Sequence, residues 1–280
     1  MNRFEGKTAL VTGARTGVGY ELTKKLLAEG WQVAALNRSD MVAGDPLIDA
    51  ALRDGRMRVY KGDLADFKSL KAVIAAIKAG EEKIDVFFNN AGVGTDGIFF
   101  SPQGREMHFE VNSVAPYIIL QELKALVAAG DDKIVINTSS NSLLFLKAFD
   151  PALLERPTVF KKLFGPYATS KMALSLWTQE IAGAMSAEGI NIRSACPGPN
   201  KTPMTEQPAM PWWLKPFVKF VFPLPTKGAG LLYKAAFGKH RGTSGVFLNK
   251  NEVTPLKFSA QGPRVFQLVD GIYRREFLGV

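Results

Sequence analysis

A single cysteine, Cys196, is the only thiol in the 280-residue sequence, and this scarcity already narrows what the protein can be. One thiol cannot form an internal disulfide, and low cysteine usage fits a reducing compartment. Because Cys196 ends an apolar stretch, we interpret it as a small core residue rather than a reactive one. Histidine is almost as rare: His108 and His240 lack metal-ligand spacing and partners, so we predict no metal site.

Long hydrophobic runs are also missing. No apolar run approaches the ~18 residues that a transmembrane helix requires, so we expect no integral membrane segment. Met1–Lys7 leads directly into the strand-like Thr8–Val11 without the pattern of a signal peptide. Because the sequence has no internal repeat, linker or low-complexity segment, we expect residues 1–280 to form a single domain. We expect the protein to be a cytoplasmic enzyme.

Acidic residues are scarce near the end of the chain, which leaves basic charge concentrated there. Residues 201–280 hold 12 Lys/Arg and 4 Asp/Glu, which gives +8 of the overall +9. A basic surface can attract nucleic acid, an anionic membrane or an anionic substrate. No Lys/Arg block or zinc-finger spacing accompanies it, so we favour a solvated surface and predict no nucleic-acid partner.

What the sequence does contain is a regular alternation of strand and helix patterns. Strand patterns occur at 9–11, 33–36, 57–60, 84–88, 133–137 and 190–195, and helical patterns at 20–29, 69–78, 107–129 and 167–185. Strands that are apolar on both faces indicate a parallel sheet covered by helices on each side. Right-handed crossovers then predict an α/β fold with a doubly wound sheet, whose ligands bind at the carboxyl ends of the strands.

Two stretches interrupt this alternation. Residues 141–164 form a long insertion before the 167–185 helix, and residues 202–225 are rich in proline and aromatic side chains. Long irregular segments beside the carboxyl edge of such a sheet are usually binding loops or lids. We therefore expect a substrate lid at about 202–225.

A glycine-rich turn lies between the first strand and the first helix. Its sequence is Thr12-Gly13-Ala14-Arg15-Thr16-Gly17-Val18-Gly19. Glycines allow a tight turn and a close approach of a pyrophosphate, which then binds free N–H groups at the start of the helix. The turn therefore predicts a dinucleotide cofactor.

The end of the second strand distinguishes between dinucleotides. An acidic residue there would hold the adenosine ribose and repel a 2′-phosphate. This chain has Asn37-Arg38 instead, and Arg15 is available from the glycine turn. Neutral and cationic groups favour the phosphorylated cofactor, so we predict NADP(H) over NAD(H).

Two pairs of residues carry further chemistry. Tyr167 and Lys171 are one helical turn apart, where an ammonium favours the phenolate and makes the tyrosine a better proton donor and acceptor near neutral pH. Pro116 lies four residues after Asn112 and has no N–H to bond the Asn112 carbonyl. The 107–129 helix is therefore expected to kink there and to leave that carbonyl free.

Together these features resemble the short-chain dehydrogenase/reductase family. The matching residues, in the family's order, are Thr12-Gly13-x3-Gly17-x-Gly19, Asp63, Asn89-Asn90-Ala91-Gly92, Asn112, Ser140, Tyr167-x3-Lys171 and Pro197-Gly198 followed by Thr202. The resemblance implies a Rossmann-type sheet of about seven strands, a nicotinamide cofactor and reversible interconversion of a carbonyl and an alcohol.

The resemblance also implies roles for the catalytic residues. Tyr167 would be the general acid in carbonyl reduction and the general base in alcohol oxidation, with Lys171 lowering its pKa and binding the nicotinamide ribose. Ser140 would donate to the substrate oxygen. Ser139 is the neighbouring alternative; strand alternation points the two serines to opposite faces, and the family pattern selects Ser140. Asn112 would bind a water that links Lys171 to solvent.

The cofactor contacts follow from the turn and from the resemblance. Asp63 is expected to contact the adenine and Thr202 the nicotinamide carboxamide. The residues predicted to bind NADP(H) are Thr12, Gly13, Arg15, Gly17, Val18, Gly19, Asn37, Arg38, Asp63, Leu64, Asn90, Ala91, Gly92, Tyr167, Lys171, Pro197, Gly198 and Thr202.

A looser resemblance concerns the retinol-dehydrogenase-like branch of the family. The long spacing from Ser140 to Tyr167 is similar to that branch, as is Trp212-Trp213-Leu214-x-Pro216-Phe217. The aromatic segment 212–222 either packs as a lid, lines an apolar pocket or touches a membrane surface, and each alternative favours a lipophilic substrate.

Two expectations remain about association and function. Most family members form dimers or tetramers through the helices that carry Asn112 and Tyr167, so we expect a homo-oligomer unless a covering lid changes this. The alternative to an oxidoreductase is a non-catalytic dinucleotide-binding sensor or regulator that retains the fold. Loss of Tyr167 or Lys171 would have favoured the sensor, and both residues are present.

Overall fold

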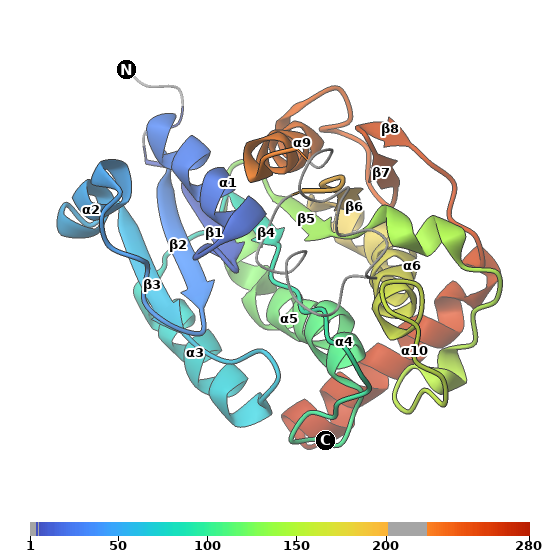
Figure 1. The fold of residues 1–280 in the computed structure, drawn as a ribbon. Helices are drawn as coiled ribbons and strands as arrows, with labels where there is room; N and C mark the ends of the chain where they lie inside the picture. Colours follow the sequence, from blue (N-terminus) through green and yellow to red (C-terminus); the bar gives the residue numbers. More distant parts are fainter. Residues whose placement is uncertain (1–3, 5, 201–222) are drawn as a thin grey trace.

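A mostly parallel sheet occupies the centre of the molecule in the computed structural model, which describes residue 4 and residues 6–200 and 223–280 (Figure 1). Its strands within this part of the chain are β1 (Thr8–Thr12), β2 (Gln32–Asn37), β3 (Met57–Lys61), β4 (Val86–Asn89), β5 (Ile134–Thr138), β6 (Asn191–Cys196), β7 (Phe247–Asn249) and β8 (Glu252–Val253). Their order across the sheet is β3-β2-β1-β4-β5-β6-β7-β8. All neighbouring strands are parallel except β7 and β8.

This order confirms the predicted doubly wound sheet. The chain runs outward from β1 to β3 and then returns to β4 on the other side of β1, so the strand order reverses between β1 and β4. Ligands of such sheets bind at the carboxyl ends of the strands at this reversal. Strands β1 to β7 match the expected number, whereas β8 was not expected. It pairs with β7 through a tight hairpin in which Lys250 and Asn251 both have positive φ, a conformation that their residue types signal only weakly.

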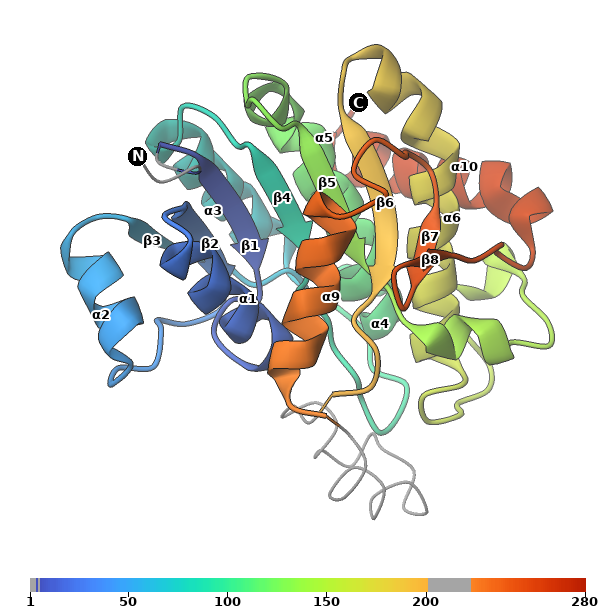
Figure 2. The ribbon, with the colours of Figure 1, turned by 90° about the horizontal axis from the view of Figure 1, so that it is seen from above.

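Helices cover both faces of the sheet (Figure 2). One apolar core lies between the sheet and α1 (Gly17–Ala28), α2 (Pro46–Arg53) and α9 (Pro225–Phe237). The other lies between the sheet and α3 (Phe67–Gly80), α5 (Ala115–Ala128), α6 (Pro166–Ala187) and α10 (Gly262–Ile272). Leu10 belongs to one core and its neighbours Ala9 and Val11 to the other, because successive strand residues point to opposite faces. This burial on both sides explains the continuous apolar strand patterns.

The helix expected at 107–129 is interrupted near the predicted kink. It consists of the short α4 (Met107–Phe109), the π-helix η1 (Glu110–Val114) and α5. The N–H of Ala115 bonds the carbonyl of Glu110, five residues back, and Pro116 contributes no N–H to the next turn. The π-helical turn is therefore a local adjustment of the backbone around the proline, and Asn112 lies at its centre.

The C-terminal segment packs against α5 and α6. Val265 and Val269 of α10 are fully buried there, and α10 continues into the π-helix η6 (Tyr273–Leu278). The Tyr117 hydroxyl donates to Asp270 Oδ1 (2.8 Å), and the Tyr273 hydroxyl donates to Glu122 Oε1 (2.8 Å). The chain thus covers with its own residues a face that was expected to mediate association, while the homo-oligomer itself stays a prediction.

The insertion and the expected lid are only partly described. The insertion 141–164 contains two 3₁₀ helices, η2 (Asn141–Phe145) and η3 (Pro151–Leu153). Most of the lid, including Thr202 and the aromatic segment 212–222, lies outside the described residues. Its last residue, Pro225, begins α9, where a proline fits because the first helical N–H needs no partner within the helix.

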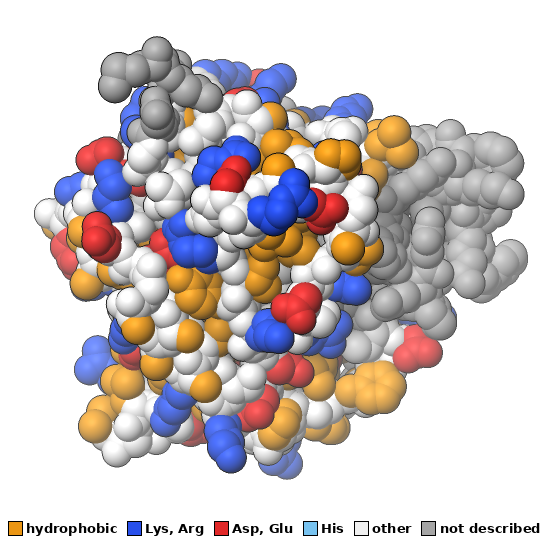
Figure 3. All heavy atoms as spheres, turned by 90° about the vertical axis from the view of Figure 1, so that its left-hand side faces the viewer, with side chains coloured by type: hydrophobic (Ala, Val, Ile, Leu, Met, Phe, Trp, Pro, Cys, Tyr) orange, Lys and Arg blue, Asp and Glu red, His pale blue; other side chains and the backbone are white. Residues whose placement is uncertain are grey.

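Charges of both signs are mixed on the face that carries α2 and α3. Figure 3 shows Lys and Arg side chains interspersed with Asp and Glu over this face, without a continuous basic patch. Within 4, 6–200 and 223–280, no helix combines the length and apolar character of a membrane-spanning segment.

Candidate functional site

The glycine turn after β1 is built so closely that side chains would not fit. Gly13 and Gly17 have φ of +69° and +60°, which L side chains rarely adopt. A Cβ on Gly13 would lie 2.9 Å from the Cα of Ala91, and a Cβ on Gly19 would lie 2.2 Å from the carbonyl oxygen of Gly13. The three glycines are therefore required by the backbone path itself.

Thr12 and Asn90 join this turn to the end of β4. The Thr12 hydroxyl accepts hydrogen bonds from the N–H groups of Asn90 (3.0 Å) and Ala91 (2.9 Å). The Asn90 Nδ2 donates in return to the Thr12 carbonyl (3.0 Å). These contacts fix the two strand ends where the strand order reverses, and they bring together four of the residues predicted to bind the cofactor: Thr12, Gly13, Asn90 and Ala91.

The end of β2 presents cationic and unpaired polar groups. Arg15 Nε donates to the carbonyl of Asp40 (2.9 Å), so the glycine-turn arginine lies beside the loop that carries the exposed Arg38. Asn37 is buried, and its Oδ1 has no hydrogen-bond partner among the described residues. A buried acceptor without a partner is unfavourable unless a ligand satisfies it.

The turn after β3 positions Asp63 and Leu64. Asp63 Oδ1 accepts from the N–H of Ala65 (2.9 Å), and the Asp63 N–H donates to the Ser69 hydroxyl (2.9 Å). Leu64 is buried against the core. The Asp63 carboxylate thus orders its own turn, and its predicted adenine contact stays a prediction.

These features fit a dinucleotide. The N-cap of α1, Thr16, makes no side-chain capping bond, and the first turn contains no acidic residue, so the helix start is suited to an anionic pyrophosphate. The glycine turn leaves no side chain between that helix start and a ligand. The orphaned Asn37 Oδ1 at the end of β2 supplies an acceptor for a ligand donor.

The side chain of Lys171, on α6, is buried against the end of β5. Its Nζ donates to the carbonyl of Thr138 (2.8 Å), and its side chain is almost fully shielded from solvent. Burial lowers the pKa of Lys171 to about 8, because desolvation disfavours the charged form. A lysine with this pKa can exchange a proton near neutral pH.

Tyr167 behaves differently from the sequence-based expectation. Burial raises the pKa of Tyr167 to about 12, while a hydrogen bond with Ser140 works in the opposite direction. The expected lowering of this pKa by Lys171 is therefore not what the structure gives. The reason is that desolvation of the phenolate dominates, and the Lys171 ammonium is directed to the Thr138 carbonyl.

The two serines after β5 separate as strand alternation predicts. Ser139 is buried, and its hydroxyl bonds the Ser175 hydroxyl (2.8 Å) on α6. Ser140 is partly exposed and caps the 3₁₀ helix η2, where its hydroxyl accepts from the N–H of Ser142 (3.2 Å), and it faces Tyr167, whose pKa it lowers against the effect of burial. The geometry thus pairs Ser140, not Ser139, with the tyrosine.

Asn112 is the residue that ties three elements together. Its Oδ1 accepts from the N–H of Val93 (2.8 Å), and its Nδ2 donates to the Val93 carbonyl (3.1 Å) and to the Ser170 hydroxyl (3.1 Å). A Cβ on Gly92 would lie 3.1 Å from Asn112 Oδ1 and 3.4 Å from Lys171 Nζ. Asn112, Gly92 and Lys171 therefore converge on one place.

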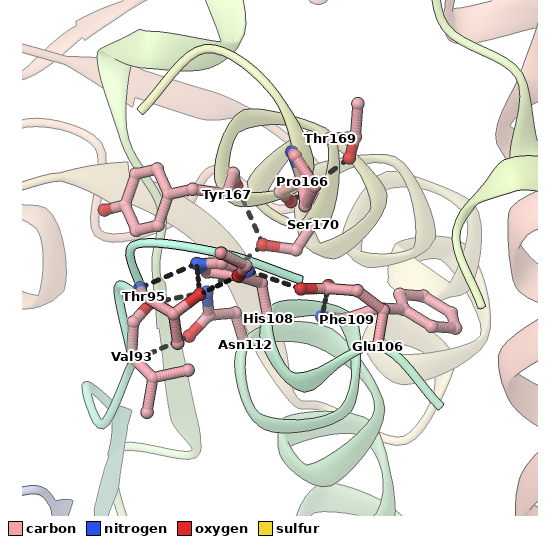
Figure 4. A network of polar contacts seen from close by, with 11 residues as sticks. Val93, Thr95, Glu106, His108, Phe109, Asn112, Pro166, Tyr167, Thr169 and Ser170 are labelled. Carbon is pink, nitrogen blue, oxygen red and sulfur yellow. Dashed lines mark hydrogen bonds and ion pairs between the residues drawn. The ribbon is translucent and has the colours of Figure 1, made fainter. Parts of the chain in front are cut away.

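A buried histidine beside these residues carried no functional role in the sequence analysis. His108 Nδ1 lies 2.5 Å from Glu106 Oε1, and its Nε2 accepts from the N–H of Thr95 (3.0 Å) (Figure 4). Its ring meets the Tyr167 ring edge to face, with centroids 6.1 Å apart. A glutamate two residues before a histidine at a helix start is too common a pattern to have revealed this. In the described part of the chain no three His, Cys, Asp or Glu side chains form a metal-ligand group.

The loop after β6 is held by a residue that sequence reasoning missed. Asn200 Nδ2 donates to the carbonyls of Pro197 (2.9 Å) and Gly198 (2.8 Å), and its Oδ1 accepts from the N–H of Gly228 in α9 (3.0 Å). Gly198 has φ of +74°. Cys196 is buried, as expected for a core residue, and burial raises its pKa.

Comparisons with known proteins agree with this geometry. The family model described as short chain dehydrogenase matches residues 7–149 and 158–210. The oxidoreductase UcpA of Salmonella typhimurium is 30% identical over 210 residues, which are 74% of this chain and 74% of that protein. Retinol dehydrogenase 11 of Homo sapiens is 27% identical over 241 residues, covering 81% of this chain and 71% of that protein. Retinol dehydrogenase relatives confirm the resemblance to that branch.

Solved structures share the fold. A 4-hydroxyisoleucine dehydrogenase complexed with NADH superposes with a TM-score of 0.67 at 22% identity, covering 86% of this chain and 96% of that chain. A putative NAD(P) dependent gluconate 5-dehydrogenase from Beutenbergia cavernae with bound NADP gives a TM-score of 0.66 at 21% identity, covering 88% and 96%. From its sheet, its glycine turn and these matches, the chain belongs to the short-chain dehydrogenase/reductase family of oxidoreductases.

Proposed function

We propose that the protein is an NADP(H)-dependent oxidoreductase that interconverts a carbonyl and an alcohol on a lipophilic small molecule. The observation that carries the proposal is the meeting of Ser140, Tyr167, Lys171 and Asn112 at the carboxyl edge, next to a glycine turn shaped for a dinucleotide. The nicotinamide ring supplies or accepts the hydride when the cofactor is bound. The protein residues have to orient the substrate oxygen and move one proton.

Tyr167 and Ser140 have complementary roles in this proposal. In reduction, the Tyr167 hydroxyl donates its proton to the substrate oxygen as negative charge develops there. The Ser140 hydroxyl has one proton, which it directs to Tyr167 in the free protein and would direct to that substrate oxygen when substrate is bound. The phenolate left on Tyr167 costs free energy in a buried site, because desolvation has raised the tyrosine pKa to about 12. Reprotonation of Tyr167 therefore requires a nearby proton donor.

Lys171 and Asn112 meet this requirement. With a pKa of about 8, Lys171 is charged at neutral pH and can give up a proton at small cost. Asn112 lies beside it, at the π-helical turn whose backbone is adjusted around Pro116. We propose that Asn112 binds the water that connects Lys171 to solvent.

The cofactor preference rests on the end of β2. Arg38 and Arg15 belong to adjacent loops, and no acidic residue follows Asn37 directly to repel a 2′-phosphate. Replacing Arg38 with alanine should weaken NADP(H) binding by about tenfold, the effect of one lost charged hydrogen bond, and leave NAD(H) binding unchanged. Equal losses for both cofactors would remove Arg38 from this role.

The substrate class rests on exposed aromatic side chains. Phe99 and Phe100, in the loop after β4, are each about half exposed, at 50% and 51%. The loop is anchored by Val93 and Thr95 to the helix that carries Asn112. The relatives named retinol dehydrogenases also support a lipophilic substrate. A cytoplasmic location and a homo-oligomeric state complete the proposal.

The experiment is a panel of lipophilic ketones, aldehydes and quinones incubated with the purified protein and NADPH, followed by NADPH absorbance. We expect turnover of at least one class, with slower turnover when NADH replaces NADPH. Tight NADPH binding measured by fluorescence, without turnover of any panel member in either direction, would instead support the non-catalytic sensor.

A further inference from the structure

Two side chains of one helix hold the loop after β4. Asn112 bonds both the N–H and the carbonyl of Val93, and His108 accepts the N–H of Thr95. His108 and Asn112 are four residues apart across the junction of α4 and η1, and both are buried. The loop is therefore fastened at two points, two residues apart, to a single stretch of helix.

The same two side chains also contact the first turn of α6. Asn112 Nδ2 donates to the Ser170 hydroxyl, and Ser170 donates in turn to the carbonyl of Tyr167 (2.8 Å). His108 meets the Tyr167 ring edge to face. In Figure 4 the tyrosine ring projects away from this network, with its hydroxyl at the far end. His108 therefore contacts the ring of Tyr167 and not its reacting hydroxyl oxygen.

The contacts of His108 assign its tautomer. The Thr95 N–H donates to His108 Nε2 (3.0 Å), so this nitrogen carries no proton. The Thr95 hydroxyl also lies 3.3 Å from Nε2, but it donates its proton to the carbonyl of Gly97 (2.7 Å). The ring proton lies on Nδ1 and is donated to Glu106 Oε1. Glu106 is itself fixed, because its Oε2 accepts from the N–H of Phe109 at the start of α4.

The geometry points to His108, oriented by Glu106, as a positioning residue of the active site. It holds Thr95, in the loop after β4, against α4 and packs against the Tyr167 ring, so that the hydroxyl is presented to the substrate oxygen. This inference rests on the proposed function. It adds to that function a buried Glu–His pair outside the residues that touch the substrate.

Three variants separate the hydrogen bond from the shape of the ring. His108→Phe keeps a planar ring beside Tyr167 but gives Thr95 no acceptor. His108→Gln restores an acceptor near the position of Nε2, whereas Glu106→Gln keeps one of the two acceptor oxygens, replaces the other with an NH₂ donor and removes the carboxylate charge. His240→Gln is the matched control, because His240 is the other histidine and is remote in the chain.

We expect His108→Phe to lower kcat by about 10- to 100-fold, since small misplacements of catalytic groups have effects of this size. The dissociation constant of NADPH should change by less than about threefold, and His108→Gln should recover most of the lost kcat. Glu106→Gln should fall between them, and His240→Gln should match the wild type. A kcat in His108→Phe equal to wild type, or a loss that His108→Gln does not relieve, would overturn the inference.

A spectroscopic measurement tests the contact without turnover. With two histidines in the chain, long-range ¹H–¹⁵N spectra of wild type and His240→Gln identify the His108 ring unambiguously. The inference requires the Nδ1–H tautomer and slow hydrogen exchange of the Thr95 amide that becomes fast in His108→Phe. An Nε2–H tautomer would overturn it. If the wild type turns over no substrate, the proposed function fails while this measurement still tests the contact.

Discussion

The two halves of the carboxyl edge are held by different kinds of contact. In the cofactor half, where β1 ends beside β4, the contacts depend on the backbone: Gly13 and Gly19 approach neighbouring main chain so closely that a Cβ would overlap it, and the Thr12 hydroxyl accepts from backbone N–H groups just after β4. In the catalytic half, at β5 and α6, the contacts are made by buried polar side chains, among them Lys171 and Asn112.

This difference teaches what each half is sensitive to. The cofactor half should suffer when an atom is added, because its backbone leaves no room. The catalytic half should suffer when a polar atom is removed or its charge changes, because buried partners are then left unsatisfied.

The largest effect should come from removing one oxygen in the catalytic half. Tyr167→Phe keeps the ring that packs on His108 but loses the proton donor, so kcat should fall by about 10²- to 10⁴-fold. NADPH affinity, measured by fluorescence titration, should stay the same. Tyr60→Phe, at the end of β3, is the control and should retain full turnover. Near-normal turnover in Tyr167→Phe would refute the proposed mechanism.

The second-largest effect should be a loss of stability on breaking a buried ion pair near the catalytic half. Arg105 and Glu110 are both buried and bond each other (2.9 Å), and Arg105 also bonds Glu276 of η6. Arg105→Met would leave the Glu110 carboxylate buried without its cation, so the free energy of unfolding should fall by about 3–5 kcal/mol in urea titration. Arg56→Met, which breaks an exposed pair with Asp54 in the turn before β3, should cause no measurable change. Similar results for both variants would contradict the contrast.

In the cofactor half the informative change is an added methyl group. Gly19→Ala would place a Cβ 2.2 Å from the Gly13 carbonyl oxygen and 2.4 Å from Asn90 Nδ2, so the turn must move. We expect a loss of up to about 3 kcal/mol, shared between folding and NADPH binding. Gly183→Ala, in α6, is the control, because a Cβ there meets nothing within 4 Å. Unchanged NADPH affinity and melting temperature in Gly19→Ala would show that the turn is not closely packed.

The same contrast explains what the sequence could predict. The glycine turn could be predicted because the backbone conformation at Gly13 favours one residue type. The strand order could be predicted because apolar strands alternate with helices. The interruption of the helix at Asn112 could also be predicted from a backbone requirement, because Pro116 has no N–H. The supporting residues His108 and Asn200 were not, because their partners lie at separations that no local pattern encodes. The sign of the Tyr167 pKa shift was missed because it depends on burial, which only the folded chain defines.

The smallest of these effects should appear as a pH dependence of stability in the catalytic half. The folded-state pKa of Lys171 is about 8, below its ordinary value of 10.5, so between these values the unfolded chain binds the proton and the folded chain does not. Stability contributed by this group must therefore rise with pH across that window. The free energy of unfolding of the wild type, minus that of Lys171→Met, should increase by about 2 kcal/mol from pH 8 to pH 10, since each pKa unit corresponds to about 1.4 kcal/mol. Lys171→Met lacks the titration, and the subtraction removes the contribution of every other group that titrates alike in both proteins. A difference that stays flat or falls with pH would mean that Lys171 is not desolvated, and the catalytic half would then lack the buried charge that distinguishes it from the glycine turn.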